Sequence, residues 1–283
     1  MNRRLNFIFS LLVGFSVFFS AVQIQSATND DKPNQPLPFQ LNEELYFEGE
    51  FTKAILRGIN IGEMKLRITQ SPNQTNTEKQ TQNYNITGEI VSKGFATKLF
   101  GINFHQLIET TVDPTNFRVV KDNKLDEQGK RIRKSETVID KENGKITWTE
   151  TNANLVNPTP RVLTIEFKGD VQNLATAFYY LRLQPLKVGQ SFTVPIHDSG
   201  RVYNVAVKVT QRKQMKTAVG KVWAVRTELD IFGENKLIDG KGSAALWFTD
   251  DERKIPVHLQ VKNDSGTIDF KLKKMAAKKD VLP

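Results

Sequence analysis

The sequence predicts a mainly β fold: an antiparallel curved sheet or open barrel with one short helix near residues 170–183. Three observations support this prediction. Short segments in which apolar and polar residues alternate recur along the chain, and a period of two is typical of strands buried on one face. Turn residues separate these segments. One stretch has instead the spacing of three and four residues that indicates a helix.

The alternating segments follow one another at short intervals. LYFEGEF at 45–51 precedes MKLRIT at 64–69, and Gly58 and Gly62 suit a reversal between these two strands. The other predicted strands occupy residues 84–93, 105–113, 117–125, 133–141, 145–150, 161–168, 190–198, 201–212, 221–232, 242–250, 256–263 and 267–274. The polar stretch 70–83 is expected to form a long loop between two strands. Many short strands at this spacing argue for a barrel or a curved sheet.

The helical segment is GDVQNLATAFYYLRLQPLKVG at 169–189. Asp170 can cap its start, and Pro185 and Gly189 can end it. The apolar residues that share one face of this helix are Val171, Leu174, Phe178 and Leu181. The helix divides residues 41–274 into two halves, which we expect to form one continuous all-β domain.

The N-terminus has the pattern of a secretory signal peptide. Two arginines precede an apolar run at 7–22, and small residues follow it up to Ala27. Cleavage near Ala27 would remove residues 1–27 and leave a polar, proline-bearing linker at 28–40. The alternative is an uncleaved membrane anchor, for which the apolar run is slightly short. We therefore expect an exported, periplasmic protein.

Composition narrows the possible partners and chemistry. The chain has no cysteine, which excludes disulfides, thiolate metal sites and a cysteine nucleophile. The net charge is +9, and removal of two signal-peptide arginines leaves +7 (9 − 2). Part of this excess lies in a basic tail at 275–283, which could contact an anionic membrane surface or stay solvated. Nucleic acid is not expected as a partner of an exported protein.

The acids, serines, glycines and histidines of the sequence do not form a recognisable catalytic or metal-binding motif. The acids Asp250, Asp251 and Glu252 lie within LWFTDDERKIPVHL at 246–259, between two apolar runs, and this arrangement predicts a hairpin turn. The serines lack a nucleophile-elbow motif and the glycines form no phosphate loop. The histidines, which lack metal-ligand spacing, are His105, His197 and His258. We therefore predict no catalytic residues, no metal site and no cofactor.

Several segments together resemble an exported bacterial family, domain of unknown function 3108. They are ELYFEGEF…INIGEMKLRI, LATAFYYLRLQPLKVGQSF and GKVWAVRTEL…ALWFTDDERKIPVHLQV, spread over residues 41–273. The resemblance implies a secreted, β-rich protein without an assigned activity. The hairpin with Trp247 and Pro256 is also similar to one in the periplasmic lipoprotein-carrier fold, in which a curved sheet covers a cavity for acyl chains.

The residues expected to contact a ligand combine a large apolar body with a polar group. They are Trp247, Tyr180, Arg182 and Tyr179. Packing in the core is the alternative role for these side chains. We expect a non-enzymatic periplasmic protein that binds a lipid or another apolar envelope component. The alternatives are a structural or interaction module in envelope assembly and a cell-wall or glycan hydrolase, which would need two facing carboxyls.

Overall fold

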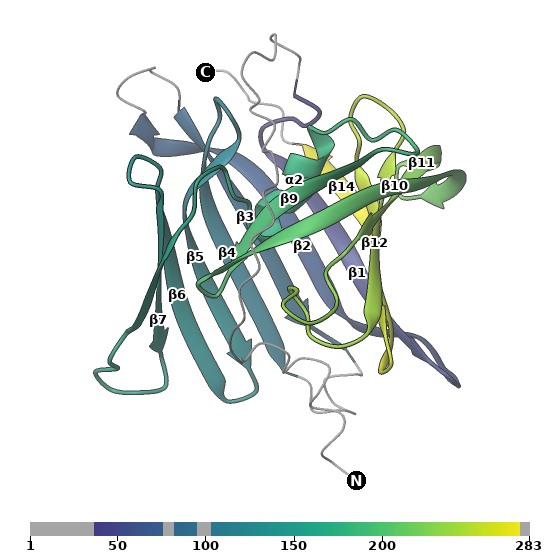
Figure 1. The fold of residues 1–283 in the computed structure, drawn as a ribbon. Helices are drawn as coiled ribbons and strands as arrows, with labels where there is room; N and C mark the ends of the chain where they lie inside the picture. The colour runs from purple at the N-terminus through teal and green to yellow at the C-terminus, as the bar shows by residue number, and fades with distance from the viewer. Residues whose placement is uncertain (1–36, 76–81, 95–102, 278–283) are drawn as a thin grey trace.

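The computed structural model describes residues 37–75, 82–94 and 103–277. The predicted signal peptide, most of the linker and the last residues of the basic tail lie outside the described residues. The described strands form one antiparallel sheet in the order β8-β7-β6-β5-β4-β3-β2-β1-β14-β13-β12-β11-β10-β9 (Figure 1). The two ends of the sheet, β8 and β9, do not pair, so the sheet is not closed into a barrel. The prediction of a mainly β, open antiparallel sheet with one helix is confirmed.

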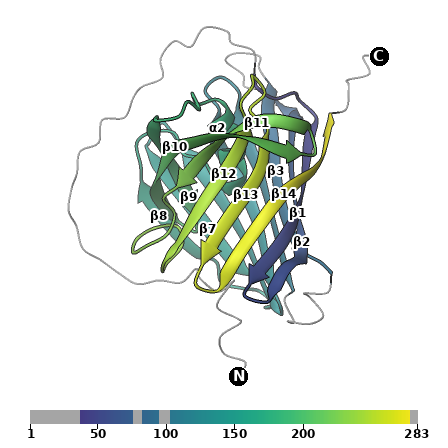
Figure 2. The ribbon, with the colours of Figure 1, turned by 90° about the vertical axis from the view of Figure 1, so that its right-hand side faces the viewer.

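The strand bounds give two meanders. The first comprises β1 (Glu43–Lys53), β2 (Leu56–Thr75), β3 (Gln82–Ser92), β4 (Phe104–Asp113), β5 (Arg118–Gln128), β6 (Arg131–Asp140), β7 (Lys145–Asn152) and β8 (Arg161–Glu166). The second comprises β9 (Ser191–Asp198), β10 (Arg201–Thr217), β11 (Gly220–Leu229), β12 (Gly242–Thr249), β13 (Pro256–Asn263) and β14 (Gly266–Ala277). Helix α2 (Leu174–Arg182) connects them, and the pairing of β1 with β14 joins them into one sheet (Figure 2).

Each strand overlaps one predicted segment, but the first reversal was predicted in the wrong place. The turn lies at residues 54–55, and β2 runs through both Gly58 and Gly62. Gly62 serves a close approach between strands: a Cβ there would lie 2.3 Å from the carbonyl oxygen of Val91. The predicted loop at 70–83 is also shorter than expected, because β2 continues to Thr75, which pairs with Gln82.

The helix begins later than predicted. Its N-cap is Asn173, whose side chain accepts hydrogen bonds from the backbone N–H groups of Ala175 and Thr176. Asp170 is therefore not the cap, and Val171 is not on the helix. The preceding residue, Gln172, forms a parallel bridge with Ile196 of β9 instead. The backbone N–H and C=O groups of Gln172 therefore bond to the edge of the sheet, and they are not available to extend the helix.

The interior lies on the face of the sheet that packs against α2. Gly88 of β3 permits close approach of the helix, since a Cβ there would lie 2.7 Å from the Cβ of Ala175. Strand register places Leu45, Leu66 and Gly88 in one row on this inner face. Two clusters of buried apolar residues meet at α2, one built mainly by β1–β5 and one mainly by β9–β12. The helix therefore fills the space that an open barrel would leave.

The sheet rolls so far that its second end crosses its first half. Figure 1 shows β9 and β10 running across the strands of the first meander, with α2 beside them. The turn between β9 and β10 reaches the inner face of β7 and β8: a Cβ on Gly200 would lie 2.9 Å from Leu163 and 3.3 Å from Trp148. Within the described ranges, no helix is long and apolar enough to cross a membrane.

Candidate functional site

Buried polar side chains gather where the β9–β10 turn meets the inner face of the first meander. We call this group the closure cluster. Its members are Thr110, Asp122, Lys124, Asn173, His197 and Asp198, from β4, β5, the helix N-cap and β9. On β5 these charged residues occupy inward positions, because Lys124 pairs with Ile108 and continues the row of Gly88 and Leu66. The cluster therefore holds together the two ends of the rolled sheet.

An ion pair forms the centre of the closure cluster. The Nζ of Lys124 lies 2.7 Å from Oδ1 of Asp198, and both side chains are nearly buried. Burial lowers the pKa of Lys124, but the charge and hydrogen bond of Asp198 outweigh it and leave the pKa raised. Burial conversely raises the pKa of Asp198. The charge and hydrogen bond of Lys124, together with the hydrogen bond of Ser199, outweigh burial and leave the pKa of Asp198 lowered. Both groups are therefore charged at neutral pH.

A second set of contacts adjoins this ion pair. Asn173 donates from Nδ2 to the hydroxyl of Thr110 at 2.7 Å and to Asp122 at 3.2 Å. Nε2 of His197 lies 3.0 Å from Oδ2 of Asp122, although the atoms are not aligned for a hydrogen bond. His197 is 4% exposed. A substrate cannot reach these groups in this conformation, so we interpret the cluster as a fastening between two parts of the sheet.

Arg182, one of the predicted ligand contacts, is fully buried and engaged by the protein. Its guanidinium pairs with Glu43 through Nη1 at 2.5 Å and Nη2 at 3.2 Å. It also donates to the carbonyl oxygens of Pro38 and Arg253. These bonds tie α2 to the start of β1 and to the turn between β12 and β13. The geometry gives Arg182 a structural role, and its contact with a ligand stays a prediction.

Tyr179 and Tyr180 lie in different surroundings on α2. Tyr179 is 1% exposed, and its ring meets Phe39 edge-on at 5.3 Å. Its hydroxyl has no hydrogen-bond partner among the described residues, and burial raises its pKa well above the usual range. Tyr180 is half-buried and packs against both apolar clusters. Tyr179 therefore places an unsatisfied donor in the apolar interior, where such groups are uncommon.

Trp247 of β12 is buried, although it shares a cross-strand row with charged residues. Its cross-strand partners are Arg226 and His258, and the same row continues through Lys271 to Glu48 on the outer face. The indole stacks on His258 at 4.9 Å and is 5% exposed. The first apolar cluster nevertheless includes both Trp247 and Tyr179, so the ring is part of the core and its contact with a ligand stays a prediction.

The acidic stretch after β12 is a turn, as predicted. Oδ1 of Asp251 accepts hydrogen bonds from the Thr249 hydroxyl at 2.7 Å and from the backbone N–H groups of Arg253 and Lys254, both at 3.1 Å. Asp250 points to another strand and pairs with Arg212 of β10 at 2.5 Å. The acids therefore do not converge on one point.

His105 of β4 lies on the outer face, between two carboxylates. Its Nδ1 is 2.9 Å from Glu127 and its Nε2 is 3.0 Å from Glu89. Burial lowers the pKa of His105, but the hydrogen bonds and charges of Glu127 and Glu89 outweigh it and leave the pKa raised. In the part of the chain that the structure describes, no three His, Asp or Glu side chains are placed to hold a metal ion.

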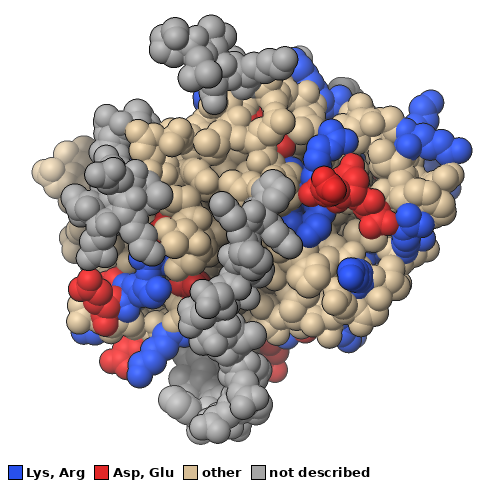
Figure 3. Space-filling model, turned by 90° about the horizontal axis from the view of Figure 1, so that it is seen from above, with Lys and Arg blue, Asp and Glu red and all other residues tan. Residues whose placement is uncertain are grey.

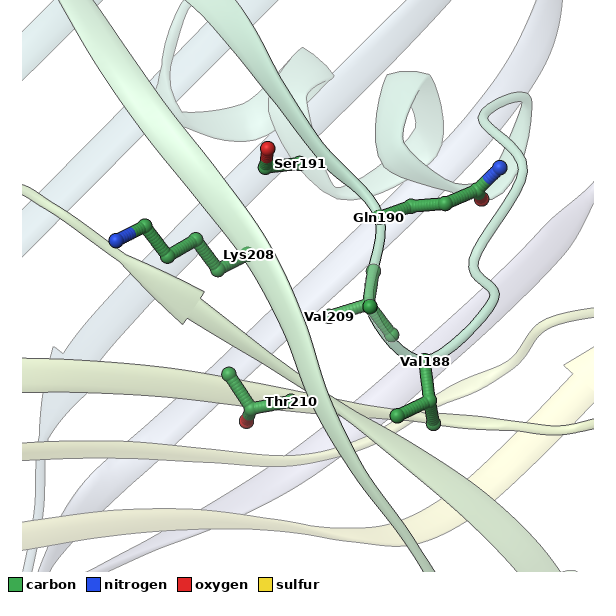
Figure 4. A pocket seen from close by; sticks show the side chains of 7 residues that line it. Val188, Gln190, Ser191, Lys208, Val209 and Thr210 are labelled. Atoms are coloured by element: carbon green, nitrogen blue, oxygen red, sulfur yellow. The ribbon is translucent and has the colours of Figure 1, made fainter.

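Two depressions lie on the surface of the described residues. One, of about 330 Å³, lies at the β9–β10 edge, where the side chains of Lys208 and Gln190 point apart (Figure 4). The other, of about 250 Å³, lies between Arg118 and Asp170 at the ends of β5 and β6. Neither gathers polar groups around one point, so we assign neither as a binding site.

Sequence reasoning missed the closure cluster, although a signal for it was present. Within FRVVKDNKL, Asp122 and Lys124 occupy positions at which the alternation of a strand places inward residues. Charges at inward positions need partners from elsewhere in the fold. The partner Asp198 is 74 residues away, beside a turn that the sequence did predict.

Comparison with known proteins identifies the family and supports the fold. A family model described as "Protein of unknown function (DUF3108)" matches residues 45–273. No curated protein matches the chain significantly. The crystal structure of a β-barrel-like protein of domain of unknown function DUF1849 from Brucella abortus is similar, with a TM-score of 0.56 and 12% identity. The match covers 84% of this chain and 98% of that one.

Proposed function

Because the chain belongs to the DUF3108 family of proteins of unknown function, we propose a function from its own geometry. The protein is a non-enzymatic, periplasmic protein that binds a lipid or another apolar component of the cell envelope inside its rolled sheet. The predicted signal peptide supports the compartment, and the β-barrel-like neighbour supports the fold alone.

One observation carries this proposal: the rolled sheet is closed by side chains rather than by a strand ladder. β8 and β9 are the ends of the sheet, and the contacts between them and the opposite half include the closure cluster and the packing of Gly200 on Leu163. Such contacts can separate without breaking any pair of hydrogen-bonded strands. An elongated apolar molecule therefore has a route into the interior beside α2.

The interior offers suitable chemistry for one end of such a molecule. The apolar clusters on both sides of α2 can surround an acyl chain, because aliphatic and aromatic side chains line them. The unpaired hydroxyl of Tyr179 can donate to a carbonyl oxygen, as in an ester or amide. Helix α2 packs in this space, so uptake requires the helix or the β9–β10 turn to move.

A disulfide across the closure tests the proposal. The chain has no cysteine, and an ideal Cβ on Gly200 lies 3.1 Å from the Cβ of Leu163, so a shift of a few tenths of an ångström reaches the separation of about 3.5–4.5 Å in a disulfide. We expect L163C/G200C to retain a co-purifying lipid when reduced and to exclude added lipid when oxidised. Native mass spectrometry after mild purification measures the bound mass, and the single variants L163C and G200C are the controls.

Two further variants locate the ligand. Y179F should lower lipid retention without changing the fold, whereas Y46F removes a hydroxyl on the outer face of β1 and should leave retention unchanged. Equal lipid uptake by the oxidised and reduced double-cysteine protein would contradict entry through this closure. A wild-type protein that binds no lipid in any preparation would remove the ligand-binding proposal altogether.

Localisation has its own test. Cleavage after Ala27 predicts an intact mass that corresponds to residues 28–283 in the periplasmic fraction of a Gram-negative host. A chain that keeps residues 1–27 and sediments with the membrane would support the anchor instead.

A second candidate function, an interaction module, has one observation in its favour. The end of the sheet near β8 exposes apolar side chains that a partner could cover. They are Val138, Leu155, Val156 and Val162, at 46%, 58%, 92% and 55% exposure. Recovery of one protein from an envelope fraction by the wild type and not by V162K would favour this alternative. Parallel recovery with and without residues 278–283 would separate it from binding by the basic tail, because this truncation leaves β14 intact.

A further inference from the structure

The hairpin of β10 and β11 carries an unbalanced positive charge. No acidic residue occurs between Asp198 and Glu228. The basic residues in that interval are Arg201, Lys208, Arg212, Lys213, Lys216, Lys221 and Arg226. In the view of Figure 3, Lys and Arg gather at the right-hand rim, over the free end of this hairpin.

The free end of the hairpin has two different faces. Met215 pairs with Val222 on one face, and Met215 and Val219 pack against the first apolar cluster. The turn itself is held by the hydroxyl of Thr217, which bonds to the backbone of Val219 and Gly220. The hairpin is therefore fixed to the body of the protein by one face, while the other stays exposed.

The exposed face combines a tryptophan with cations. Trp223 pairs with Gln214, and the next cross-strand pair on this face joins Lys216 to Lys221. Trp223 is 44% exposed, and the guanidinium of Arg212 lies 4.1 Å from the centre of its ring. Arg212 is itself held by Asp250, so it orients the indole and shares its charge with that acid.

Lys216 and Lys221 are the unexplained part of this face. Like charges directly opposite each other on paired strands are destabilising. Neither lysine has an acidic partner among the described side chains, and neither packs against the core. Stability of the hairpin thus gives no reason for this pair, whereas an external anion would relieve the repulsion. An exposed indole beside such cations is suited to the boundary between lipid headgroups and acyl chains.

We propose that the exposed face of the β10–β11 hairpin, formed by Arg212, Lys216, Lys221 and Trp223, docks the protein on an anionic lipid bilayer. The lysines bind headgroup phosphates and the indole enters the headgroup layer. The end of β14, with Lys274, lies beside β10 and adds positive charge to the same end of the molecule. This docking surface lies at the free end of the β10–β11 hairpin, and docking there does not depend on a ligand in the interior of the rolled sheet.

Sedimentation with vesicles tests the proposal on the full chain as secreted. We expect binding to vesicles of phosphatidylcholine mixed with phosphatidylglycerol, and weakening of this binding as salt is added. Phosphatidylcholine vesicles alone should bind little, and they also control for any retained apolar leader, which would enter both kinds of vesicle. K216Q/K221Q should weaken binding on the order of 25-fold, since each basic residue near such a surface contributes about fivefold.

Matched variants and tryptophan emission sharpen the test. K141Q/K145Q removes two exposed lysines at the β6–β7 turn and should bind like the wild type. Trp148 and Trp247 are buried, so a blue shift on binding should come from Trp223 and be absent in W223S. Urea unfolding of each variant verifies that it is folded.

Three outcomes would overturn the proposal. The first is equal binding to neutral and anionic vesicles, and the second is wild-type affinity in K216Q/K221Q. The third is loss of all binding on truncation after Ala277, which would assign the contact to the tail.

Discussion

The rolled sheet joins its two halves in two places by different means. At the ladder junction, β1 pairs with β14 from Glu43↔Ala277 to Thr52↔Thr267. At the side-chain junction, the β9–β10 turn meets β5, β7 and β8 through the closure cluster and Gly200. The ladder junction combines backbone hydrogen bonds with the apolar core beneath it, whereas the side-chain junction depends on few polar contacts. We therefore expect the ladder junction to stay paired when the side-chain junction opens.

The largest effect is expected at the ladder junction. Phe47 of β1 is 2% exposed and pairs with Leu272. F47A should lower the free energy of unfolding by about 3–5 kcal/mol, because it leaves a cavity in the core. Urea unfolding should show one transition at a lower midpoint. The adjacent outer-face variant E48A should cost less than about 1 kcal/mol, since it removes only an exposed ion pair with Lys273.

A smaller and more local effect is expected at the side-chain junction. K124M leaves the carboxylate of Asp198 buried without its partner, which should cost about 3 kcal/mol. Hydrogen exchange should accelerate in β9 and the start of β10, while β1 and β14 keep their protection. K124M/D198N should recover more than half of the loss. Uniform acceleration across all strands would show that the two junctions are not separable.

The glycine at the side-chain junction allows a finer test. Gly200 has a φ of +75°, and its missing Cβ leaves room for Leu163. G200A should cost about 1–3 kcal/mol through overpacking and backbone strain. L163A in the same chain should restore part of the stability, because it removes the side chain that the new methyl group meets. L163A combined with F47A should restore none of the stability that F47A removes.

The smallest effect concerns His105, which lies away from both junctions. Its pKa is raised in the folded state, so its stabilising contribution is complete below the unfolded value of about 6.5. That contribution is lost as pH rises through the folded pKa. H105Q should therefore lose less than about 1 kcal/mol at pH 6 and almost nothing at pH 9. Unfolding midpoints at both pH values provide the measurement, and hydrogen exchange at both junctions should not change.

The strands were predictable from the sequence because each depends on local alternation and on the turn beside it. The turn at 250–254 illustrates this, since Asp251 satisfies only neighbouring backbone groups. The start of the helix was not predictable, because pairing of Gln172 with β9 competes with helical hydrogen bonds. The closure cluster was missed for the same reason: Lys124 and Asp198 meet only after the sheet has rolled.

The faces of the aromatic residues illustrate a further limit. Tyr179 and Trp247 look alike in the sequence, as large side chains with a polar group. Tyr179 lies on the helix and Trp247 lies on β12 in a row with Arg226 and His258, yet both belong to the first apolar cluster. The pairing of β12 with both neighbours fixes that difference, and the pattern of residues along one strand does not show which face will meet the helix.

The pairing of β1 with β14 also determines the order in which the chain can fold. Every other strand of the first meander pairs with a near neighbour, so β2 to β8 can form hairpins as soon as they are synthesised. One edge of β1 must wait for residues 266–277, the last strand of the chain. Until then that edge is open to pairing with other chains. We therefore expect truncations that remove β14 to aggregate rather than to yield a smaller folded protein.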